Sequence, residues 1–546
     1  MRELTQDCVV FHTNSVLKRD SANRRAQLSK WIRKFHSECG TLTSDVKEAI
    51  DKLNDSSCIV IMTAHQPNLF AYGGVMRKAT LGYALSRILS KELGLPVISF
   101  FGIADQDFAN DRWLRSALLP DVQKRDGILE LRYDINQKLM LTNIPKPSVK
   151  TVDNWKNEIR RWLLSKINSV KRLGKELNIE IDINEMNLIS NSDGFLGLIN
   201  ECYDKSRNYP DFNAFLMSRI INEVWGYDTL FSRFSECQQI FEEEFKLLIS
   251  NFREYSTYVR EATDSNEVKV DQGVSELEYQ LLPFWYHCEC GSKVRLTPEF
   301  ADNSLSGVGE CDNCKREYLI KLLLNEGCGL SNIISKISAR ALAMPLVFFL
   351  GLGVCCYIGG AGGQSYLRQA KHVADHMNIL FPPIAVWRPR DRYHGISQVE
   401  ALLIYQKISG NYDSSLYTQT VEKIKKEIYE IRKETKEIES RRQEFISPHL
   451  DRDAKSDKIS EIINVKKYGP NRDDRLPNLL INERLLENIS HTLTLYPCII
   501  DYAINTSLQN TSKQWIGFLT EDGTLNSDLY LETNIRTSLP LNYTVS

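Results

Sequence analysis

The sequence has no marked excess of either charge. Its 546 residues contain 68 Lys and Arg against 70 Asp and Glu, a formal net charge of -2. Without a basic excess, the chain as a whole has no electrostatic basis for binding nucleic acid. Glycine and proline are also scarce, at 28 and 17 residues, while 10% of the residues are aromatic. This composition excludes a mainly disordered protein, and we find no internal repeat.

Features of an exported protein are missing as well. The first residues, MRELTQDCVVFHTNSVLKRD, contain no apolar stretch long enough for a secretory signal. The 13 cysteines are odd in number and spread along the chain, unlike the disulfide framework of a small secreted protein. We therefore expect a cytoplasmic protein whose cysteines are reduced.

One long segment, residues 341–367, lacks any charged side chain. Its length would admit a membrane span. However, Pro345, Gly351, Gly353 and the glycines of 359–363 divide it into short pieces. Buried parallel strands also read as continuous apolar runs. We expect this segment to be protein core, with no membrane as a partner.

The order of the apolar runs predicts an α/β protein. Two runs, Cys58–Thr63 and Val97–Ile103, read as buried strands, and residues 75–92 between them have helical periodicity. A strand, a helix and a strand in this order indicate a βαβ unit and a parallel sheet. The pattern resumes after residue 330 with an apolar run to Ile358, a helix over Ser365–Met377 and an extended segment over Pro382–Trp387.

The other long segments look helical. Residues 1–55 and 150–265 show helical spacing, and the latter has no clear strand alternation. From Val421 the apolar positions step by three and four residues, through Ile424, Ile428 and Ile431, and continue to Phe445. This spacing supports a coiled coil or a long antiparallel helix. An amphipathic helix packed on its own domain explains it equally well.

Four cysteines have the spacing of a metal site. Cys288 and Cys290 form one pair, and Cys311 and Cys314 form a second pair further along. Two short chelating turns joined by a loop supply the tetrahedral ligands that zinc prefers, and four protein ligands leave no open position. We therefore predict a structural zinc ion. His287 is an alternative ligand to Cys288, and four reduced cysteines without metal are the alternative to the whole site.

A polar loop follows the first predicted strand and leads into a helix. The loop, Thr63–Gly74, contains His65, and the helix carries Arg77 and Lys78. A helix N-terminus with glycines and cations nearby suits an anion, and His65 could stabilise charge that develops on a phosphate. An ordinary polar loop at a strand end is the alternative, because no phosphate-loop motif is present.

Two further loops follow predicted strands. Asp105 and Asp107 alternate at the end of the second strand, so both carboxylates could face one cleft. There they could hold an ammonium group, a ribose or Mg²⁺, or act as a base, whereas the alternative is helix N-capping. Residues Tyr357–Tyr366 form a glycine-rich turn between a strand and a helix, where backbone can approach an anion closely. All three loops would converge on one crevice of the sheet.

The three loops, taken in this order, resemble one family, the cysteine-adding enzyme of bacillithiol biosynthesis, described as a cysteine ligase. The family has a TGQQPGLFGGP loop followed by a helix with a lysine, and Thr63–Lys78 is similar. The family stretch DHDF resembles Asp105–Phe108, and YVGGPGE(I)AYWAQL resembles Tyr357–Gln369. The sequence departs from the family at His65, at Gln106 and at Gly362–Gln364, where the family has Gln, His and an acidic residue.

The resemblance implies a fold and an activity. It implies a Rossmann-like core related to class I aminoacyl-tRNA-synthetase-like nucleotidyl transferases, and a homodimer held by the coiled coil. The implied reaction joins cysteine, or a similar amino acid, to the amine of a small glucosamine–malate-like acceptor, with ATP as the activating cofactor. It also implies catalytic roles for His65, Asp105 and Asp107, and nucleotide or substrate binding by Gln66, Asn68, Lys78, Gly359, Gly360 and Tyr366.

The length, the order of the sequence patterns and the family resemblance together predict the domain organisation. At roughly 100–200 residues per domain, the length allows about three or four units. We predict a Rossmann-like parallel-sheet core interrupted by insertions. Its parts are the first half of the core with N-terminal helices (1–150), a helical insertion (151–283), a zinc-ribbon-like module (284–320), the second half of the core (321–400), a coiled coil or helical hairpin (401–450) and a C-terminal segment (451–546).

The sequence leaves two alternatives to the cysteine-ligase function. One is a nucleotidyl transferase or ligase of the same fold that acts on another small molecule. The other is a non-catalytic scaffold that keeps the zinc module and the coiled coil. We favour an enzyme because polar residues remain at all three strand ends, where a decayed core would be expected to lose several of them.

Overall fold

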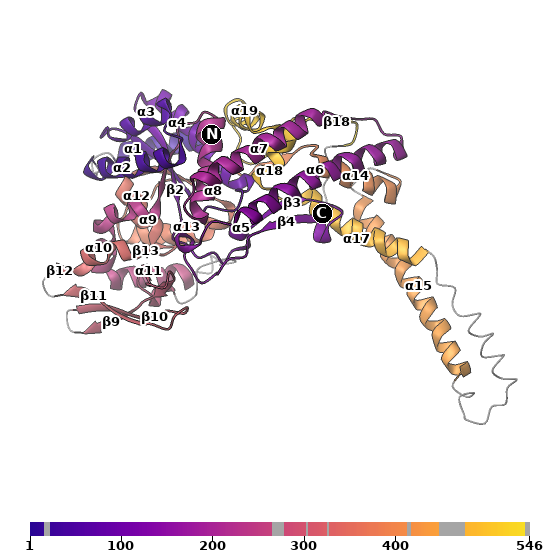
Figure 1. Cartoon of the computed structure of the whole chain (residues 1–546). Helices are drawn as coiled ribbons and strands as arrows, with labels where there is room; N and C mark the ends of the chain where they lie inside the picture. Colours follow the sequence, from indigo (N-terminus) through magenta and orange to yellow (C-terminus); the bar gives the residue numbers. More distant parts are fainter. Residues whose placement is uncertain are drawn as a thin grey trace.

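The computed structural model describes residues 1–15, 22–264, 278–301, 304–324, 327–411, 416–446 and 475–540. Three helices open the chain, as predicted, before the central sheet begins (Figure 1). They are α1 (Arg2–Ser15), α2 (Ala22–Cys39) and α3 (Ser44–Leu53).

A five-stranded parallel sheet forms the centre of the protein and confirms the predicted α/β class. Its spatial order is β15-β14-β1-β2-β6. Counted along the chain, this is the order 3-2-1-4-5 of a Rossmann fold, read from β6. The direction of winding reverses between β1 and β14, where open α/β sheets bind their ligands. The strands are β1 (Ile59–His65), β2 (Val97–Ile103), β6 (Leu230–Arg233), β14 (Val354–Ile358) and β15 (Ile384–Ala385).

Both faces of this sheet are buried, which is why its strands read as continuous apolar runs. Along β1, Ile59 and Ile61 pack in one hydrophobic cluster, and Val60 and Met62 pack in a second cluster on the other face. Helix α4 (Gly73–Leu93) covers the first face, while α3 and α12 (Ala343–Leu352) cover the second. The uncharged segment 341–367 thus supplies α12 and β14 to the core. No helix in the described ranges is long and apolar enough to cross a membrane.

A long crossover connects β2 to β6 and contains most of the segment predicted to be helical. The expectation of no strand in residues 150–265 is wrong, because β6 lies in this segment and pairs with β2. With four residues buried on both faces, β6 leaves no alternation to detect. The crossover elements are α5 (Arg112–Arg115), β3 (Ser116–Pro120), β4 (Ile128–Arg132), α6 (Val149–Leu177), β5 (Ile181–Ile183), α7 (Glu185–Lys205) and α8 (Tyr209–Ser218).

A second long crossover, from β6 to β14, contains the cysteine module. Three short helices precede two small antiparallel sheets, ordered β13-β7-β8 and β12-β11-β10-β9. The helices are α9 (Phe234–Cys237), α10 (Glu242–Ser250) and α11 (Phe252–Asp264). The strands are β7 (Phe284–His287), β8 (Lys293–Arg295), β9 (Thr297–Ala301), β10 (Ser304–Glu310), β11 (Glu317–Leu324), β12 (Gly327–Cys328) and β13 (Ile337–Ala339).

The remaining elements follow β14. Helix α13 (Gln364–His376) connects β14 to β15. The short strand β16 follows β15 and pairs in parallel with β17, which comes after further helices. These elements are β16 (Arg390–Arg392), α14 (Ile396–Ser409), α15 (Tyr417–Ile446), α17 (Arg475–Thr494), α18 (Ile499–Thr506), α19 (Leu508–Gly517), β17 (Asp528–Tyr530) and β18 (Ile535–Thr537).

The helix with the three–four apolar spacing packs within its own chain. Figure 1 shows α15 leading away from the body and α17 lying beside its first part. Ile424, Ile428 and Ile431 are buried, and the Tyr417 hydroxyl donates a hydrogen bond to the Leu486 carbonyl of α17. No coiled coil is evident in the described part of the chain, because Ile424 and Ile428 of this apolar stripe pack in the same cluster as Leu486 of α17. The side chain of Phe445 lies outside the described residues.

Candidate active site at the carboxyl edge of the sheet

The carboxyl ends of β1 and β14 meet where the winding of the sheet reverses. The Thr63 hydroxyl donates to the Ile358 carbonyl at 3.1 Å, which joins the two strand ends. Lys78, on the second turn of α4, reaches this point, and its Nζ donates to the Ala64 carbonyl at 3.4 Å. A Cβ at Gly360 would lie 3.2 Å from Lys78 Cε and 3.4 Å from Nζ. The first and third predicted loops therefore meet at the Lys78 ammonium group.

Lys78 is a buried cation without a carboxylate partner among the described residues. Only 9% of the residue is exposed, and the hydrogen bond to Ala64 is long. Burial lowers the pKa of Lys78 to about 8, so the side chain is still charged at neutral pH. The neighbouring Arg77, in contrast, pairs with Asp391. A buried charge that lacks a counter-charge is costly, which indicates that this position is built for an anionic ligand.

His65 lies beside Lys78 and is held as a neutral imidazole. Its Nδ1 donates to the Gln66 carbonyl at 2.9 Å, because a carbonyl oxygen can only accept. The remaining nitrogen, Nε2, can therefore only accept, and the Tyr72 hydroxyl donates to it at 3.3 Å. Burial and the charge of Lys78 lower the pKa of His65 to about 3. The imidazole thus orients the Tyr72 hydroxyl, and the predicted role of His65 in stabilising phosphate charge stays a prediction.

Asp105 and Asp107 do not point at a common ligand. Asp105 is 2% exposed and accepts hydrogen bonds from the Ser235 amide, at 3.0 Å, and from the Ser235 hydroxyl. Burial raises the pKa of Asp105 to about 6, although Ser235 opposes this shift. The chain turns directly after β2 instead of continuing as a strand, so the expected alternation is lost. Neither residue caps the next helix, since Asp111 accepts from the Trp113 amide there.

Asp107 faces the loop after β1 and a cation that the sequence analysis missed. It accepts from Gln66 Nε2 at 2.8 Å, and Lys293 Nζ lies 3.6 Å from its Oδ1. Lys293 is 5% exposed and packs its ammonium group over the rings of Phe108, at 4.7 Å, and Trp285, at 5.1 Å. Burial lowers the pKa of Lys293, and Asp107 opposes this effect. The second loop thus brings together a carboxylate, an amide and a buried cation.

Lys293 belongs to β8 of the cysteine module, and this module rests on the segment that follows β4. The Gly291 carbonyl accepts from the Met140 amide at 2.9 Å and from Asn143 Nδ2 at 3.1 Å. The module therefore delivers Lys293 to the edge of the sheet. No signal in the sequence marks this lysine, because its place depends on how the two folding units pack.

The remaining predicted residues line the same edge. Tyr366 is partly buried and shares a hydrogen bond with Tyr357, and burial raises the pKa of Tyr366 to about 12. The Gly359 amide donates to the Ala385 carbonyl at 2.9 Å, so it extends the sheet. Asn68 Nδ2 donates to the Trp113 carbonyl at 3.2 Å, while its buried Oδ1 has no partner among the described residues. The roles predicted for these residues stay predictions.

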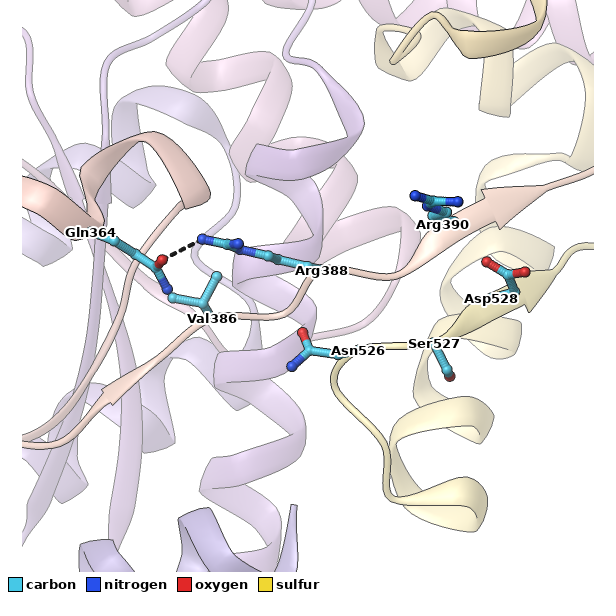
Figure 2. Close-up of a pocket in the computed structure, with 7 residues that line it drawn as sticks. All are labelled: Gln364, Val386, Arg388, Arg390, Asn526, Ser527 and Asp528. Atoms are coloured by element: carbon cyan, nitrogen blue, oxygen red, sulfur yellow. Dashed lines mark hydrogen bonds between the residues drawn. The ribbon is translucent and has the colours of Figure 1, made fainter. Parts of the chain in front are cut away.

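A pocket of about 490 Å³ opens beyond the glycine-rich turn (Figure 2). The Arg388 guanidinium crosses the pocket and donates to the Gln364 side-chain oxygen. Arg390 also lines it, and within the described ranges neither arginine has a carboxylate partner, since Asp528 pairs with Arg392 at 3.1 Å. The lining residues are Gln364, Val386, Arg388, Arg390, Asn526, Ser527 and Asp528.

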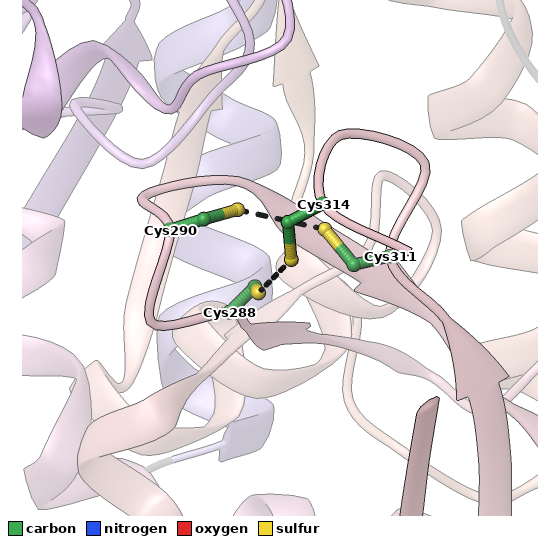
Figure 3. Close-up of side chains that lie close together, drawn as sticks. All are labelled: Cys288, Cys290, Cys311 and Cys314. Atoms are coloured by element: carbon green, nitrogen blue, oxygen red, sulfur yellow. Dashed lines mark hydrogen bonds between the residues drawn. The ribbon is translucent and has the colours of Figure 1, made fainter. Parts of the chain in front are cut away.

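The four predicted cysteines form a compact cluster (Figure 3). All four Sγ atoms lie within 4.8 Å of one another, with 3.4 Å between Cys288 and Cys314 and 3.6 Å between Cys290 and Cys311. Tetrahedral zinc with Zn–S bonds of about 2.3 Å requires sulfur atoms about 3.8 Å apart. The tight turn of the first pair places Gly291 at φ 87°, a conformation that favours glycine. The cluster therefore fits a structural metal, and zinc best.

His287 is not part of this cluster. The described cysteines complete the tetrahedral set by themselves, and His287 Nε2 is buried without a hydrogen-bond partner among the described residues. Strand alternation explains why Cys288 and not His287 joins the cluster, because successive side chains along an extended segment point to opposite faces. The alternative ligand considered from the sequence is therefore not supported.

Gly360 allows Lys78 to reach the strand ends, which leads to a testable expectation. A methyl group in Gly360→Ala would push the flexible end of Lys78 and narrow the space beside it. We expect binding of ATP, followed by isothermal titration calorimetry, to weaken at least about tenfold, or about 1.4 kcal/mol. The melting temperature should change little because a flexible side chain can shift.

Gly194→Ala is the matched control for this variant. Gly194 lies within α7, and a Cβ there would contact nothing within 4 Å. The control should stabilise the protein by up to about 1 kcal/mol through helix propensity and leave ATP binding unchanged. Equal ATP affinity in both variants would show that Gly360 does not border the ligand.

Comparison with known proteins finds a family model that matches part of this edge of the sheet. Residues 7–112 match the family model described as "Bacillithiol biosynthesis BshC, N-terminal Rossmann-like domain". The matched segment contains β1, α4 and β2 with the first two loops, and the glycine-rich turn lies outside it. No curated protein matches the sequence significantly.

Among solved structures, one match is a "putative arginyl t-RNA synthetase" from Campylobacter jejuni. It is 12% identical, with 84% of this chain and 92% of that chain covered, and the TM-score is 0.21. A TM-score this low supports no statement about fold or function.

Proposed function

We propose that the chain is a ligase, on the basis of the match between residues 7–112 and the family model of the N-terminal Rossmann-like domain of bacillithiol biosynthesis. Its reaction would join the carboxyl group of cysteine, or of a similar amino acid, to the amine of a small glucosamine–malate-like acceptor. ATP would activate the carboxyl group, and attack by the amine would release the activating phosphate-containing group. Zinc would have a structural role only, because four cysteines fill its coordination sphere.

The buried, unpaired ammonium group of Lys78 is the observation that carries this proposal. Both the phosphates of a nucleotide and the carboxylate of an amino acid are anions that would restore the missing counter-charge. Lys78 also lies between β1 and β14, at the carboxyl edge where sheets of this order bind ligands. During transfer, a fixed cation here would stabilise negative charge on the activated carboxyl group or its leaving group.

His65 would position Tyr72 beside the reacting groups. Its pKa of about 3 keeps the imidazole neutral, so Nε2 accepts from the Tyr72 hydroxyl and is a weak base. The proton that the attacking amine loses as the amide bond forms would pass to the departing phosphate-containing group. Asp107, exposed enough to meet a ligand and hydrogen-bonded to Gln66, would hold the amino group of cysteine.

The arginine-lined pocket fits the acidic part of the acceptor. Val386, in its wall, would lie 3.8 Å from a Cβ at Gly359, so the pocket adjoins the glycine-rich turn. Guanidinium groups recognise carboxylates in bidentate fashion. A malate-like group bound by Arg388 and Arg390 would leave the sugar amine directed toward Lys78.

The arginine pocket yields a prediction for steady-state kinetics. Arg388→Met keeps the length of the side chain and removes its charge. Loss of one charge-assisted contact should raise the KM for the acidic acceptor about 10- to 100-fold, equivalent to about 1.4–2.7 kcal/mol, with the KM for ATP unchanged. Arg33→Met, on the exposed surface of α2, is the control. An equal rise in both KM values would place Arg388 outside the acceptor site.

A second candidate function is favoured by the same lysine. Lys78 would bind the phosphates of the nucleotide equally well in a nucleotidyl transferase, so the identity of the amine substrate decides between the two functions. Thermal-shift measurements with ATP, AMP, cysteine and the glucosamine–malate conjugate separate them, because a ligand of the folded state raises its stability. A shift with nucleotides and cysteine supports the cysteine ligase. A rise in melting temperature with nucleotides and a different amine, but not with cysteine, would favour the nucleotidyl transferase instead.

We also propose that the protein forms a homodimer through the exposed face of the helical pair α15–α17. Large side chains remain exposed on this helical pair, with Tyr429 at 68% and Ile481 at 55%. A second copy would cover them. Light scattering of the full chain should give twice the mass of one chain, and Tyr429→Glu should lower it toward the monomer. A monomer at all concentrations would contradict the proposal.

A further inference from the structure

Two histidines and a glutamate meet on the surface, away from the four cysteines. His372 and His376 lie one turn apart on α13, with ring centroids 4.2 Å apart. Glu261 comes from α11, which packs against α13. One ligand atom from each residue lies within 4.8 Å of the others. The three side chains therefore come from two helices that are far apart in the sequence, and their ligand atoms converge on one point.

The hydrogen bonds of the histidines leave metal-binding nitrogens free. His376 Nδ1 donates to the His372 carbonyl at 2.9 Å, so its Nε2 keeps a lone pair. Such a hydrogen bond on the second ring nitrogen is typical of histidines that bind metals. His372 Nε2 is shielded from solvent and has no hydrogen-bond partner among the described residues, because the Glu261 carboxylate is 3.8 Å away.

We propose that Glu261, His372 and His376 bind a divalent transition-metal ion, with Zn²⁺ the first choice. Imidazole and carboxylate ligands suit zinc and its neighbours among the first-row metals. Small side-chain rotations would bring the three ligand atoms to about 2.0–2.2 Å from a shared ion. Three protein ligands leave a fourth position for water, unlike the cysteine cluster, so this site would exchange its metal more readily.

The proposed ion would tie the crossover helix α11 to α13. Helix α13 begins at Gln364, directly after the glycine-rich turn, and carries Tyr366 in its first turn. A metal bridge at its other end would therefore stabilise the helix that forms one wall of the candidate active site. Metal binding should raise the melting temperature of the full chain through ligation of the folded state.

Cobalt substitution of the full-length protein distinguishes the two sites. Co²⁺ bound by thiolates gives intense sulfur-to-metal charge-transfer absorption, whereas Co²⁺ bound by imidazole and carboxylate gives only weak d–d bands. We expect the first equivalent to produce the charge-transfer band and a second equivalent to produce the weak bands alone. In His376→Gln the second equivalent should be lost, while the charge-transfer band stays unchanged.

Controls keep this test decisive. His491→Gln removes another exposed histidine whose Nδ1 contacts a backbone carbonyl, at 3.1 Å, and it should retain both equivalents. Glu261→Gln should weaken the second site beyond the about 10- to 100-fold that loss of an outer-shell partner costs. Circular dichroism should show that all variants are folded. Equal cobalt stoichiometry in the wild type and His376→Gln would overturn the proposal and leave His372 and Glu261 as a surface contact without metal.

Discussion

Lys78→Met is expected to give a protein that is more stable than the wild type and catalytically inactive. The substitution keeps a linear side chain but removes a buried charge. One pKa unit corresponds to about 1.36 kcal/mol, so lowering the pKa from 10.5 to about 8 corresponds to about 3 kcal/mol of burial cost. Chemical denaturation at pH 7 should show a gain of up to this size. Turnover and the ATP-induced thermal shift should both be lost.

The pH dependence of this gain follows from the sign of the pKa shift. The unfolded chain keeps the Lys78 proton up to pH 10.5, whereas the folded protein releases it from about pH 8. The free energy of unfolding of the wild type therefore rises with pH across this interval. The advantage of Lys78→Met should be full below pH 8 and should disappear by about pH 10.5. A loss of stability in Lys78→Met instead would mean that the ammonium group has an internal counter-charge.

We expect that removal of zinc both unfolds the cysteine module and inactivates the protein. Structural zinc sites in small peptides contribute about 10–16 kcal/mol of binding free energy, which is available only to the folded form. Cys311→Ser should abolish stoichiometric zinc in metal analysis and make residues 284–320 sensitive to proteolysis. Activity should fall at least about 100-fold, because Lys293 would no longer be held against Asp107.

Lys293→Met separates these two consequences. This variant keeps the four cysteines and should retain zinc and protease resistance, since Lys293 is not a ligand. Its activity should nevertheless fall, because the cation beside Asp107 is gone. If Lys293→Met is fully active while Cys311→Ser is not, the module supports the site through its fold alone.

The sequence predicted those parts of the fold that are recorded in local patterns. The strands β1, β2 and β14 were predictable because each is a buried apolar run followed by a polar loop. Strand β6 was not, since four residues buried on both faces carry no period. The cysteine cluster was predictable because two pairs at short spacing have few other uses.

The site was predictable only in part. The local pattern, a helix with cations after a strand, marked Arg77 and Lys78 alike, and the family resemblance selected Lys78. The argument for Asp105 and Asp107 failed because the chain turns after β2, and turns of this kind leave no simple mark in a sequence. Lys293 and Arg388 could not be found, because tertiary packing alone brings them to the edge of the sheet.

Formation of the amide product by the purified full-length protein is the most direct test of the ligase proposal. The protein is incubated with ATP, cysteine and the glucosamine–malate conjugate, and the products are followed by mass spectrometry. We expect the cysteine amide of the conjugate from the wild type and none from Lys78→Met. ATP turnover without this amide, or the amide at wild-type yield from Lys78→Met, would contradict the account.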